Sequence, residues 1–518
     1  MWITAERFMR DGRCLRIGDT VFLPSPSDEA YRQALDELDE ETIAATGQEL
    51  PFMPLSGLGR FCLLEDQYKE FVEASVIRRE RRQEPRWIRK LSPIVQGQFR
   101  AKWYRSNELL DQRWVNWVPF SGIQYVVLDG GFTRALADKL KLYRLEGIRQ
   151  LGFLRDPNTV EMSGQKMGVY TQPFHHDRFD HSLSVAALLR LMAYNNRLPR
   201  YTWRNGYAAG MTHDALTPAG GDTTKFIDPV RFDEDAHYPE LLVGPAWQEL
   251  RRRYGLSAKL LIRTIRNEGV LGQLLDLADK IAYVGRDAWK FAHHAGAPMA
   301  DAIGLIGDFV QDHPDVCTLW QWVTVVDGRV AVRNAEALYD FLTLRALLFR
   351  HLYYNPQCRF HELLLATNVT RYLYEMGALT AEWLISHGDY QLEDTLSKFL
   401  ERPNWQANDF FYHDYLKVEA FADRHQAECR QRELFRSGIT FLYLEDVSRS
   451  VKTGADFFVE TPEGQVGSLA AMYPAAAEQL ASSVSWPKPY RLYWATETAF
   501  SKRAVKKLRA WKRRKLGL

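Results

Sequence analysis

Two histidines and two aspartates with the chemistry of metal ligands recur along the middle of the chain. His181 stands in the segment HDRFDHSLSV, His213 and Asp214 are adjacent in MTHDALTP, and Asp279 opens DKIAYVGRD. Imidazole and carboxylate groups together suit iron, manganese, zinc or cobalt better than magnesium alone. A bound ion of this kind polarises a phosphoryl oxygen and lowers the pKa of bound water. The four residues therefore predict one divalent transition-metal ion suited to phosphoryl chemistry.

Helices must bring these four side chains together, because they lie far apart in the sequence. The segment around His181 has apolar residues at helical period, namely Leu183, Val185, Leu188, Leu189 and Leu191. We expect a second helix to carry His213 and Asp214 and a third to carry Asp279. The alternative, that all four are merely buried and hydrogen-bonded, explains poorly an adjacent His-Asp pair with two further partners.

Composition indicates an ordinary globular protein with more than one lobe. The chain has 518 residues, of which 46% are hydrophobic and 25% charged, and its formal net charge is +2. Five scattered cysteines form no CxxC pair, which fits a reducing compartment. The sequence has no signal-peptide pattern and no apolar run of membrane-spanning length. We therefore expect a cytoplasmic protein without a membrane partner.

Changes in composition along the chain predict four regions in a mainly α protein. Residues 1–120 form an accessory region, 121–377 a helical catalytic core, 378–437 a helical extension, and 438–518 a small α+β subdomain with a basic tail. Arginines and aromatic residues are interleaved from Arg78 to Arg105, and the tail SKRAVKKLRAWKRRKLGL contains no acidic residue. A solvated surface is the simplest interpretation of both stretches. The alternatives are a nucleic-acid or nucleotide-phosphate contact for the first, and a contact with nucleic acid or an acidic protein for the tail.

Four blocks of the sequence resemble one enzyme family. YRLEGIRQLG (143–152), HDRFDHSLSV (176–185), DKIAYVGRD (279–287) and LYDFLTLRALLFRHLYY (338–354) occur in the order of the HD-domain deoxynucleoside triphosphohydrolases. The chain resembles the vertebrate SAM-and-HD-domain enzyme and the bacterial dGTPases, although it shows no SAM domain. The resemblance implies an HD-domain phosphohydrolase core in which His181, His213, Asp214 and Asp279 hold the metal.

The same resemblance implies a substrate and the residues that bind it. Deoxynucleoside triphosphates, accompanied by Mg²⁺, would be cleaved to a deoxynucleoside and inorganic triphosphate. A role in depleting deoxynucleotides during phage infection follows by analogy alone. The phosphates would contact Arg178, Lys280 and Arg345, because guanidinium groups clamp phosphate oxygens. The residues that match the sugar-binding positions are Gln150, Leu151, Tyr283, Asp287 and Tyr353.

The sequence departs from the family pattern after the His-Asp pair. Thr217 and Asp222 occupy positions where the family usually has histidines, so the general acid for the leaving oxygen must be another group. The candidates are Asp222, Glu234, Asp235 and His237. A carboxyl group can act as the acid if a low-dielectric site raises its pKa.

The regulatory site of the family also looks altered. Asp138 matches the aspartate that reads guanine, but Tyr143 and Glu146 replace its glutamine and arginine partners. We expect a homo-oligomer, as in the family, with a different nucleotide regulator or partner. Two alternatives remain open, namely a phosphodiesterase or nucleotidase acting on another nucleotide or nucleic acid, and a nucleotide sensor that keeps the metal.

Overall fold

The computed structural model describes residues 130–518 and six short strands before residue 130. Within residues 130–518, the positions left out of the description are 155, 163–164, 172–175, 295–299, 314–315, 317–318, 402–414, 449–452 and 497–499. The sequence also predicts an acidic helix near Asp28–Thr46. This segment and the basic stretch Arg78–Arg105 both lie outside the described residues.

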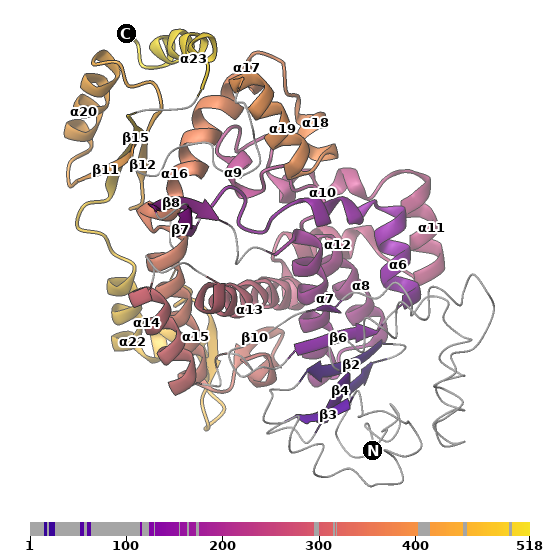
Figure 1. Cartoon of the computed structure of the whole chain (residues 1–518). Coiled ribbons are helices and arrows are strands. Elements are labelled where there is room, and N and C mark those ends of the chain that lie inside the picture. The colour runs from indigo at the N-terminus through magenta and orange to yellow at the C-terminus, as the bar shows by residue number, and fades with distance from the viewer. Residues whose placement is uncertain are drawn as a thin grey trace. The chain divides into compact units, whose positions relative to one another are not determined.

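The mainly helical fold predicted from the sequence is confirmed (Figure 1). Among the described residues, no helix has the length and apolar character that a membrane span requires. The chain divides into two compact units, each built from separate segments. Unit 1 comprises residues 1–142, 180–212 and 241–286, and unit 2 comprises residues 143–179, 213–240 and 287–518.

Unit 1 combines short strands with long helices. Its four-stranded antiparallel sheet has the order β1 (Leu15–Ile17), β2 (Thr20–Ser25), β6 (Gln124–Leu128) and β5 (Trp114–Val115), and β3 (Phe52–Leu55) pairs with β4 (Arg60–Leu63). β1 and β2 pair antiparallel, from Leu15 opposite Phe22 to Ile17 opposite Thr20. The helices are α6 (Gly130–Lys139), α7 (Arg178–Asn195), α8 (Arg200–Thr212), α11 (Gly244–Tyr254), α12 (Ala258–Ile265) and α13 (Gly269–His294). The unit boundaries cross α7 and α13.

Helix α7 is buried on every side, although its sequence suggested a one-sided apolar face. All ten residues from His181 to Arg190 are buried, including the guanidinium of Arg190, which lies 4.1 Å from the ring centroid of Trp203 on α8. The two helices approach closely where Gly210 faces Ala186. A Cβ atom at Gly210 would lie 2.6 Å from the Ala186 Cα, so only glycine fits there without a shift of the backbone.

Unit 2 begins with a single helical turn, η3 (Leu142–Gly147), and the hairpin of β7 (Asp156–Met162) and β8 (Gln165–Thr171). Helices α9 (Asp222–Lys225) and α10 (Glu234–Leu241) follow the His-Asp pair. A run of helices then forms the main core; it consists of α14 (Ala300–Asp312), α15 (Ala335–Leu348), the π-helical η7 (Phe349–Tyr353), α16 (Pro356–Leu364), the π-helical η8 (Leu365–Thr370), α17 (Arg371–Glu375), α18 (Ala381–Ser386) and α19 (Asp389–Leu400).

Two small sheets complete unit 2. In one, β14 (Val466–Ser468), β13 (Phe458–Glu460), β10 (Arg329–Val332) and β9 (Val323–Val326) are neighbours in that order. In the other, β15 (Tyr490–Ala495) pairs antiparallel with β11 (Leu416–Phe421) and β12 (Leu442–Asp446). The segments ITFLYLED, ADFFVET and YRLYWAT have the pattern of strands, and they contain β12, β13 and β15, respectively. β11, in contrast, lies in the region 378–437 that the sequence predicts to be helical. The remaining helices are α20 (Arg424–Arg436), α21 (Leu469–Met472), α22 (Pro474–Ser483) and α23 (Lys502–Lys515).

Candidate functional site

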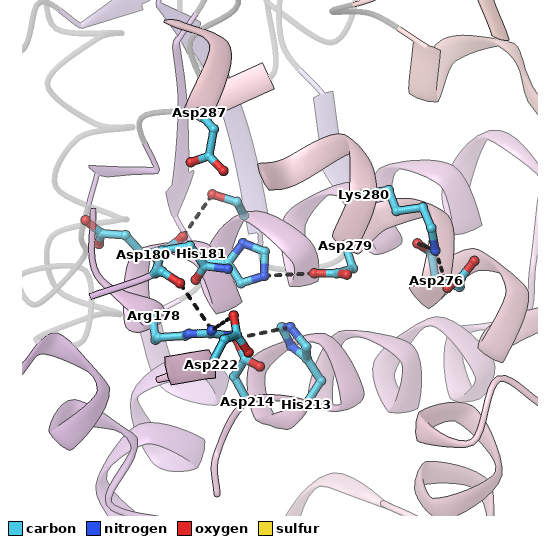
Figure 2. Close-up of polar contacts among 12 residues, drawn as sticks. Arg178, Asp180, His181, His213, Asp214, Asp222, Asp276, Asp279, Lys280 and Asp287 are labelled. Atoms are coloured by element: carbon cyan, nitrogen blue, oxygen red, sulfur yellow. Dashed lines mark hydrogen bonds and ion pairs between the residues drawn. The ribbon is translucent and has the colours of Figure 1, made fainter. Parts of the chain in front are cut away.

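His181 and Asp279 lie together inside unit 1. His181 is in the first turns of α7 and Asp279 is in the middle of α13, and the imidazole Nε2 lies 2.9 Å from the carboxylate Oδ1 (Figure 2). The His181 side chain is 1% exposed, whereas the Asp279 side chain is 36% exposed. The fold therefore places a buried imidazole beside an accessible carboxylate, although the two residues are 98 positions apart in the sequence.

His213 and Asp214 follow directly after the last residue of α8. His213 Nε2 lies 3.5 Å from Asp214 Oδ2, and the same Asp214 oxygen accepts a hydrogen bond of 2.9 Å from Arg178 Nη1 (Figure 2). Asp214 is buried. The carboxylate is thus shared between a histidine and an arginine, both in its own unit.

Three of the four expected ligands form a cluster that fits a divalent metal ion. One ligand atom from each of His181, His213 and Asp279 lies within 4.8 Å of the others. Among the described residues, these three form the one group of His, Cys, Asp or Glu side chains that could hold a metal ion. Two neutral imidazoles and a carboxylate are the donor set that suits transition metals. Asp214 is outside this group, and its carboxylate accepts a hydrogen bond from Arg178.

Arg178 is the centre of a charge network in unit 2. Its Nη2 donates to Asp222 Oδ2 at 2.6 Å and to the backbone oxygen of Gln150 at 3.2 Å, while its Nη1 binds Asp214. Burial lowers the pKa of Arg178, but the carboxylates of Asp214 and Asp222 outweigh it and hold that pKa well above its ordinary value. The guanidinium is therefore charged and fixed in direction.

Asp222 lies between two cations. Arg178 is on one side, and Lys225 Nζ lies 2.9 Å from Asp222 Oδ1 on the other. Partial burial raises the pKa of Asp222, but Arg178 and Lys225 lower it to about 2, and the side chain is 55% exposed. Asp222 is consequently ionised at neutral pH and has no proton to donate.

The other three candidates for the general acid differ in their surroundings. Glu234 opens α10 with its side chain 10% exposed, and its Oε2 lies 3.2 Å from Lys225 Nζ. Burial raises the pKa of Glu234, and Lys225 acts in the opposite direction. Burial also raises the pKa of Asp235. His237 Nδ1 contacts the exposed Glu240 at 2.7 Å, so its ring is engaged at the surface.

Two further cations expected at the phosphates are held on helices. Lys280 follows Asp279 on α13, and its ammonium forms an ion pair with Asp276 one turn earlier (Figure 2). Arg345 is buried near the end of α15, and its guanidinium carbon lies 4.6 Å from the ring centroid of Phe349.

Three of the residues expected at the sugar lie around His176 in unit 2. The Tyr353 hydroxyl donates to Asp287 Oδ2 at 2.6 Å, and Asp287 Oδ1 lies 3.6 Å from His176 Nδ1. The backbone N–H of Gln150 donates to the His176 carbonyl oxygen at 2.8 Å. Leu151 is next to Gln150 and half-buried, and Tyr283 is half-buried on α13 in unit 1.

The sequence analysis assigned no role to His176 or Lys225, although both contact predicted site residues. His176 opens the HDRFDHSLSV segment, and Lys225 is three residues after Asp222, so position within a motif was the available signal. Gly152 adopts a φ of +53°, and a Cβ there would lie 2.6 Å from the Gly220 carbonyl oxygen. This contact joins the Gln-Leu-Gly segment to the loop before Asp222.

The residues of the altered regulatory site have contacts of their own. Asp138 forms an ion pair of 3.4 Å with Arg134 on α6, and the ring of Tyr143 stacks on Phe179 at 5.1 Å between centroids. Glu146 lies in the η3 turn. Nothing in these contacts provides a test of nucleotide regulation, which stays a prediction.

A mainly helical fold and a group of two histidines and an aspartate that could hold a metal ion define a helical protein with a candidate metal centre. Its fold is similar to that of a solved phosphohydrolase. A phosphohydrolase from Bacteroides thetaiotaomicron superposes with a TM-score of 0.51 over 74% of this chain and 100% of that one, at 16% identity. A hypothetical protein from Aquifex aeolicus superposes with a TM-score of 0.47 over 77% of this chain and 99% of that one, also at 16% identity. No protein-family model and no curated protein matches the sequence.

Proposed function

We propose that this protein is a metal-dependent phosphohydrolase and that its substrates are deoxynucleoside triphosphates. The observation that carries the proposal is the group of His181, His213 and Asp279, whose ligand atoms lie within 4.8 Å of one another. The phosphohydrolase fold agrees with it. These three residues, with Asp214 beside them, would hold one divalent ion, which when bound would supply a Lewis acid for a phosphoryl oxygen.

Arg178 supports a phosphate ligand next to the metal residues. Its guanidinium is 5% exposed and already faces the oxygens of two carboxylates, in the planar geometry that phosphate oxygens also satisfy. Because the guanidinium is held in place before substrate binds, it stabilises negative charge without reorganising.

A sugar with a free 3′-hydroxyl suits the group around His176. Asp287 accepts from the Tyr353 hydroxyl and lies 3.6 Å from His176, so carboxylate, imidazole and phenol groups that can bind a hydroxyl are close together. Leu151 and Tyr353 would crowd a 2′-hydroxyl, and a wall of this kind rejects an added hydroxyl by only about a hundredfold. Preference for deoxyribose is therefore expected to be moderate unless the packing is tight. Depletion of deoxynucleotides in phage defence is the biological role that such an activity would serve.

Glu234 is the residue that we assign as general acid for the leaving 5′-oxygen. Among the candidate carboxyl groups, Glu234 has the least exposed side chain, whereas Asp222 and Asp235 are exposed. Burial of Glu234 favours its protonated form. Lys225 keeps contact with both Glu234 and Asp222, so a change in the charge of one carboxylate alters the other. Asp222 stays ionised and positions Arg178.

The test is product analysis with the full-length protein. Each of the four deoxynucleoside triphosphates is incubated with Mn²⁺ or Fe²⁺, singly and in mixtures, and the phosphate products are separated. We expect inorganic triphosphate and deoxynucleoside. Pyrophosphate or orthophosphate would replace the proposal by a nucleotidase or phosphodiesterase, and binding of nucleotide without cleavage would replace it by a sensor.

A matched pair of variants links this activity to the metal residues. Asp279→Ala removes a ligand, and loss of several kcal/mol of charge stabilisation should lower the rate about a thousandfold or more. It should also lower the metal content of the purified protein. Asp308→Ala removes an exposed carboxylate from α14 and should change neither. Full activity in Asp279→Ala would exclude the metal assignment.

A further inference from the structure

The C-terminal helix α23 carries a dense row of cations that the proposed reaction does not use. Its segment from Ser501 to Leu518 contains nine Lys or Arg and no acidic residue. Seven of these cations are exposed, and one of them, Lys515, forms an ion pair of 2.8 Å with Glu375. The other six define the basic face of α23, namely Lys502, Arg503, Lys506, Lys507, Arg513 and Arg514. Figure 1 shows the helix beside α20, near the end of the chain.

The opposite side of α23 is fixed in the core of unit 2. Ala504, Leu508 and Trp511 are at most 5% exposed, and Trp511 Nε1 donates to Glu375 Oε2 at 2.9 Å. The ammonium of Lys512 is buried and donates to Asn368 and to the carbonyl oxygen of Leu442. The helix therefore presents its cations from a rigid base.

Arg509 connects α23 to the end of α20. Its Nη2 donates to the Phe435 carbonyl oxygen at 2.7 Å, and its guanidinium carbon lies 4.5 Å from the Phe435 ring centroid. Arg436, the next residue, is exposed, as is Arg432 one turn earlier. The positive surface thus continues from the basic face of α23 onto α20.

We propose that the basic face of α23 binds the phosphodiester backbone of nucleic acid. A helix of this length extends about 20 Å, a distance over which duplex DNA carries about a dozen phosphates. A protein partner is less suited, since protein interfaces have an apolar centre depleted in charge, and the apolar residues of α23 are buried. A membrane-binding helix inserts its apolar face, which here is covered by the protein's own core.

The face also predicts how the nucleic acid is recognised. The aromatic residue of α23, Trp511, is buried, so this helix offers no ring on which a base can stack. Lysine and arginine contacts to phosphate fix position without reading sequence. Binding is therefore expected to be independent of sequence and to weaken strongly with salt.

The experiment measures binding of a fluorescein-labelled 20-base-pair DNA duplex to the full-length protein by anisotropy between 50 and 200 mM salt. Six phosphate contacts predict that the affinity falls about a thousandfold over this range. The variant Lys502→Gln, Arg503→Gln, Lys506→Gln, Lys507→Gln keeps two of the six cations. Its affinity should fall only about tenfold over the same range, from a weaker starting value.

The matched control variant also replaces four exposed cations by glutamine, but in unit 1. Arg251→Gln, Arg252→Gln, Lys259→Gln, Arg266→Gln alters four exposed cations on and after α11 and α12 and should bind as the unaltered protein does. Circular dichroism checks that both variants are folded.

Three outcomes would overturn the proposal. They are equal loss of binding in the two variants, a steep salt dependence that survives in the α23 variant, and preferential binding to phosphatidylserine vesicles. None of them depends on hydrolytic activity, so the assignment of the metal site is tested separately.

Discussion

At the candidate site, the protonation state of the charged residues depends on the neighbouring side chains. Asp214, Asp222 and Glu234 are three carboxyl groups near Arg178 and Lys225, so three acids share two cations. Asp222 has the closest contacts to both cations, which lower its pKa to about 2, while Glu234 is the more buried of the two carboxyl groups that Lys225 contacts. The surroundings therefore keep Asp222 ionised and favour the protonated form of Glu234.

The first prediction concerns the pH dependence of this pair. A general acid must be protonated, so the rate should fall as pH rises through the pKa of Glu234. In Glu234→Gln the rate should fall by roughly 10² to 10⁴, and the alkaline limb should disappear from the pH–rate profile. Glu240→Gln changes an exposed carboxylate in the same helix and should preserve both. An unchanged profile in Glu234→Gln would move the acid role to Asp235 or to water.

Elements join residues that the sequence separates widely. Arg359 on α16 donates to Glu362 and, at 3.1 Å from its Nε, to Glu445 on β12, which also accepts from the Tyr493 hydroxyl on β15 at 2.9 Å. Thr223 Oγ1 donates to Glu362 Oε1 at 3.3 Å and accepts from the N–H of Phe153 at 3.0 Å. This buried network ties the β12–β15 sheet to helix α9, which contains Asp222.

The second prediction follows from the charge of that network. One guanidinium cannot neutralise two buried carboxylates, and burial raises the pKa of Glu362 from 4.5 to about 7. Between these values the folded protein holds a proton that the unfolded chain has lost, so its free energy of unfolding decreases as pH rises. The decrease attributable to Glu362 is about 3 kcal/mol between pH 4.5 and 7.

Chemical denaturation at pH 5 and pH 8 measures this difference. Glu362→Gln should abolish the contribution, so its unfolding free energy should depend less on pH than that of the unaltered protein. Glu433→Gln alters an exposed carboxylate on α20 and should keep the original dependence. If Glu362→Gln and the unaltered protein respond identically to pH, the carboxyl group does not retain a proton in the folded state.

At the scale of the whole molecule, the C-terminal helix belongs to the same hydrophobic core as the helices before it. Leu508 and Ala504 cluster with Leu363, Leu364 and Leu392, together with Phe153 from the start of unit 2. Phe500 and Phe441 also belong to this cluster. The last residues of the chain therefore contribute to the stability of unit 2, in addition to the surface that they present.

The third prediction tests that contribution. Trp511→Ala deletes a buried ring that packs against Tyr372 at 6.0 Å between centroids. Removal of a buried tryptophan typically costs about 3 to 5 kcal/mol of unfolding free energy, measured by urea titration. Trp322→Ala removes a ring that is 38% exposed and should cost much less. Equal costs for the two variants would mean that α23 is not docked as described.

The sequence predicted the elements with strong local signals. Period and motif located α7, α13, β12, β13 and β15, and motif spacing selected His181, His213 and Asp279 before their positions were known. What it missed depends on contacts across long separations. Arg359 and Glu445 lie 86 residues apart, and the charge of Asp222 depends on Arg178, 44 residues earlier, as well as on Lys225 in its own helix. The strand β11 owes its place to pairing with β15, which no local pattern specifies.

The close approach of Gly210 to Ala186 has a practical consequence. Helix α8 ends two residues later, and His213 comes next, so a single added methyl group at position 210 would act as a spacer that displaces this imidazole without altering any ligand. The radius of the cation that the centre accepts should thus be adjustable from a residue that never touches the ion. Gly210 is therefore the first position to substitute in an attempt to change which metal ion the candidate site binds.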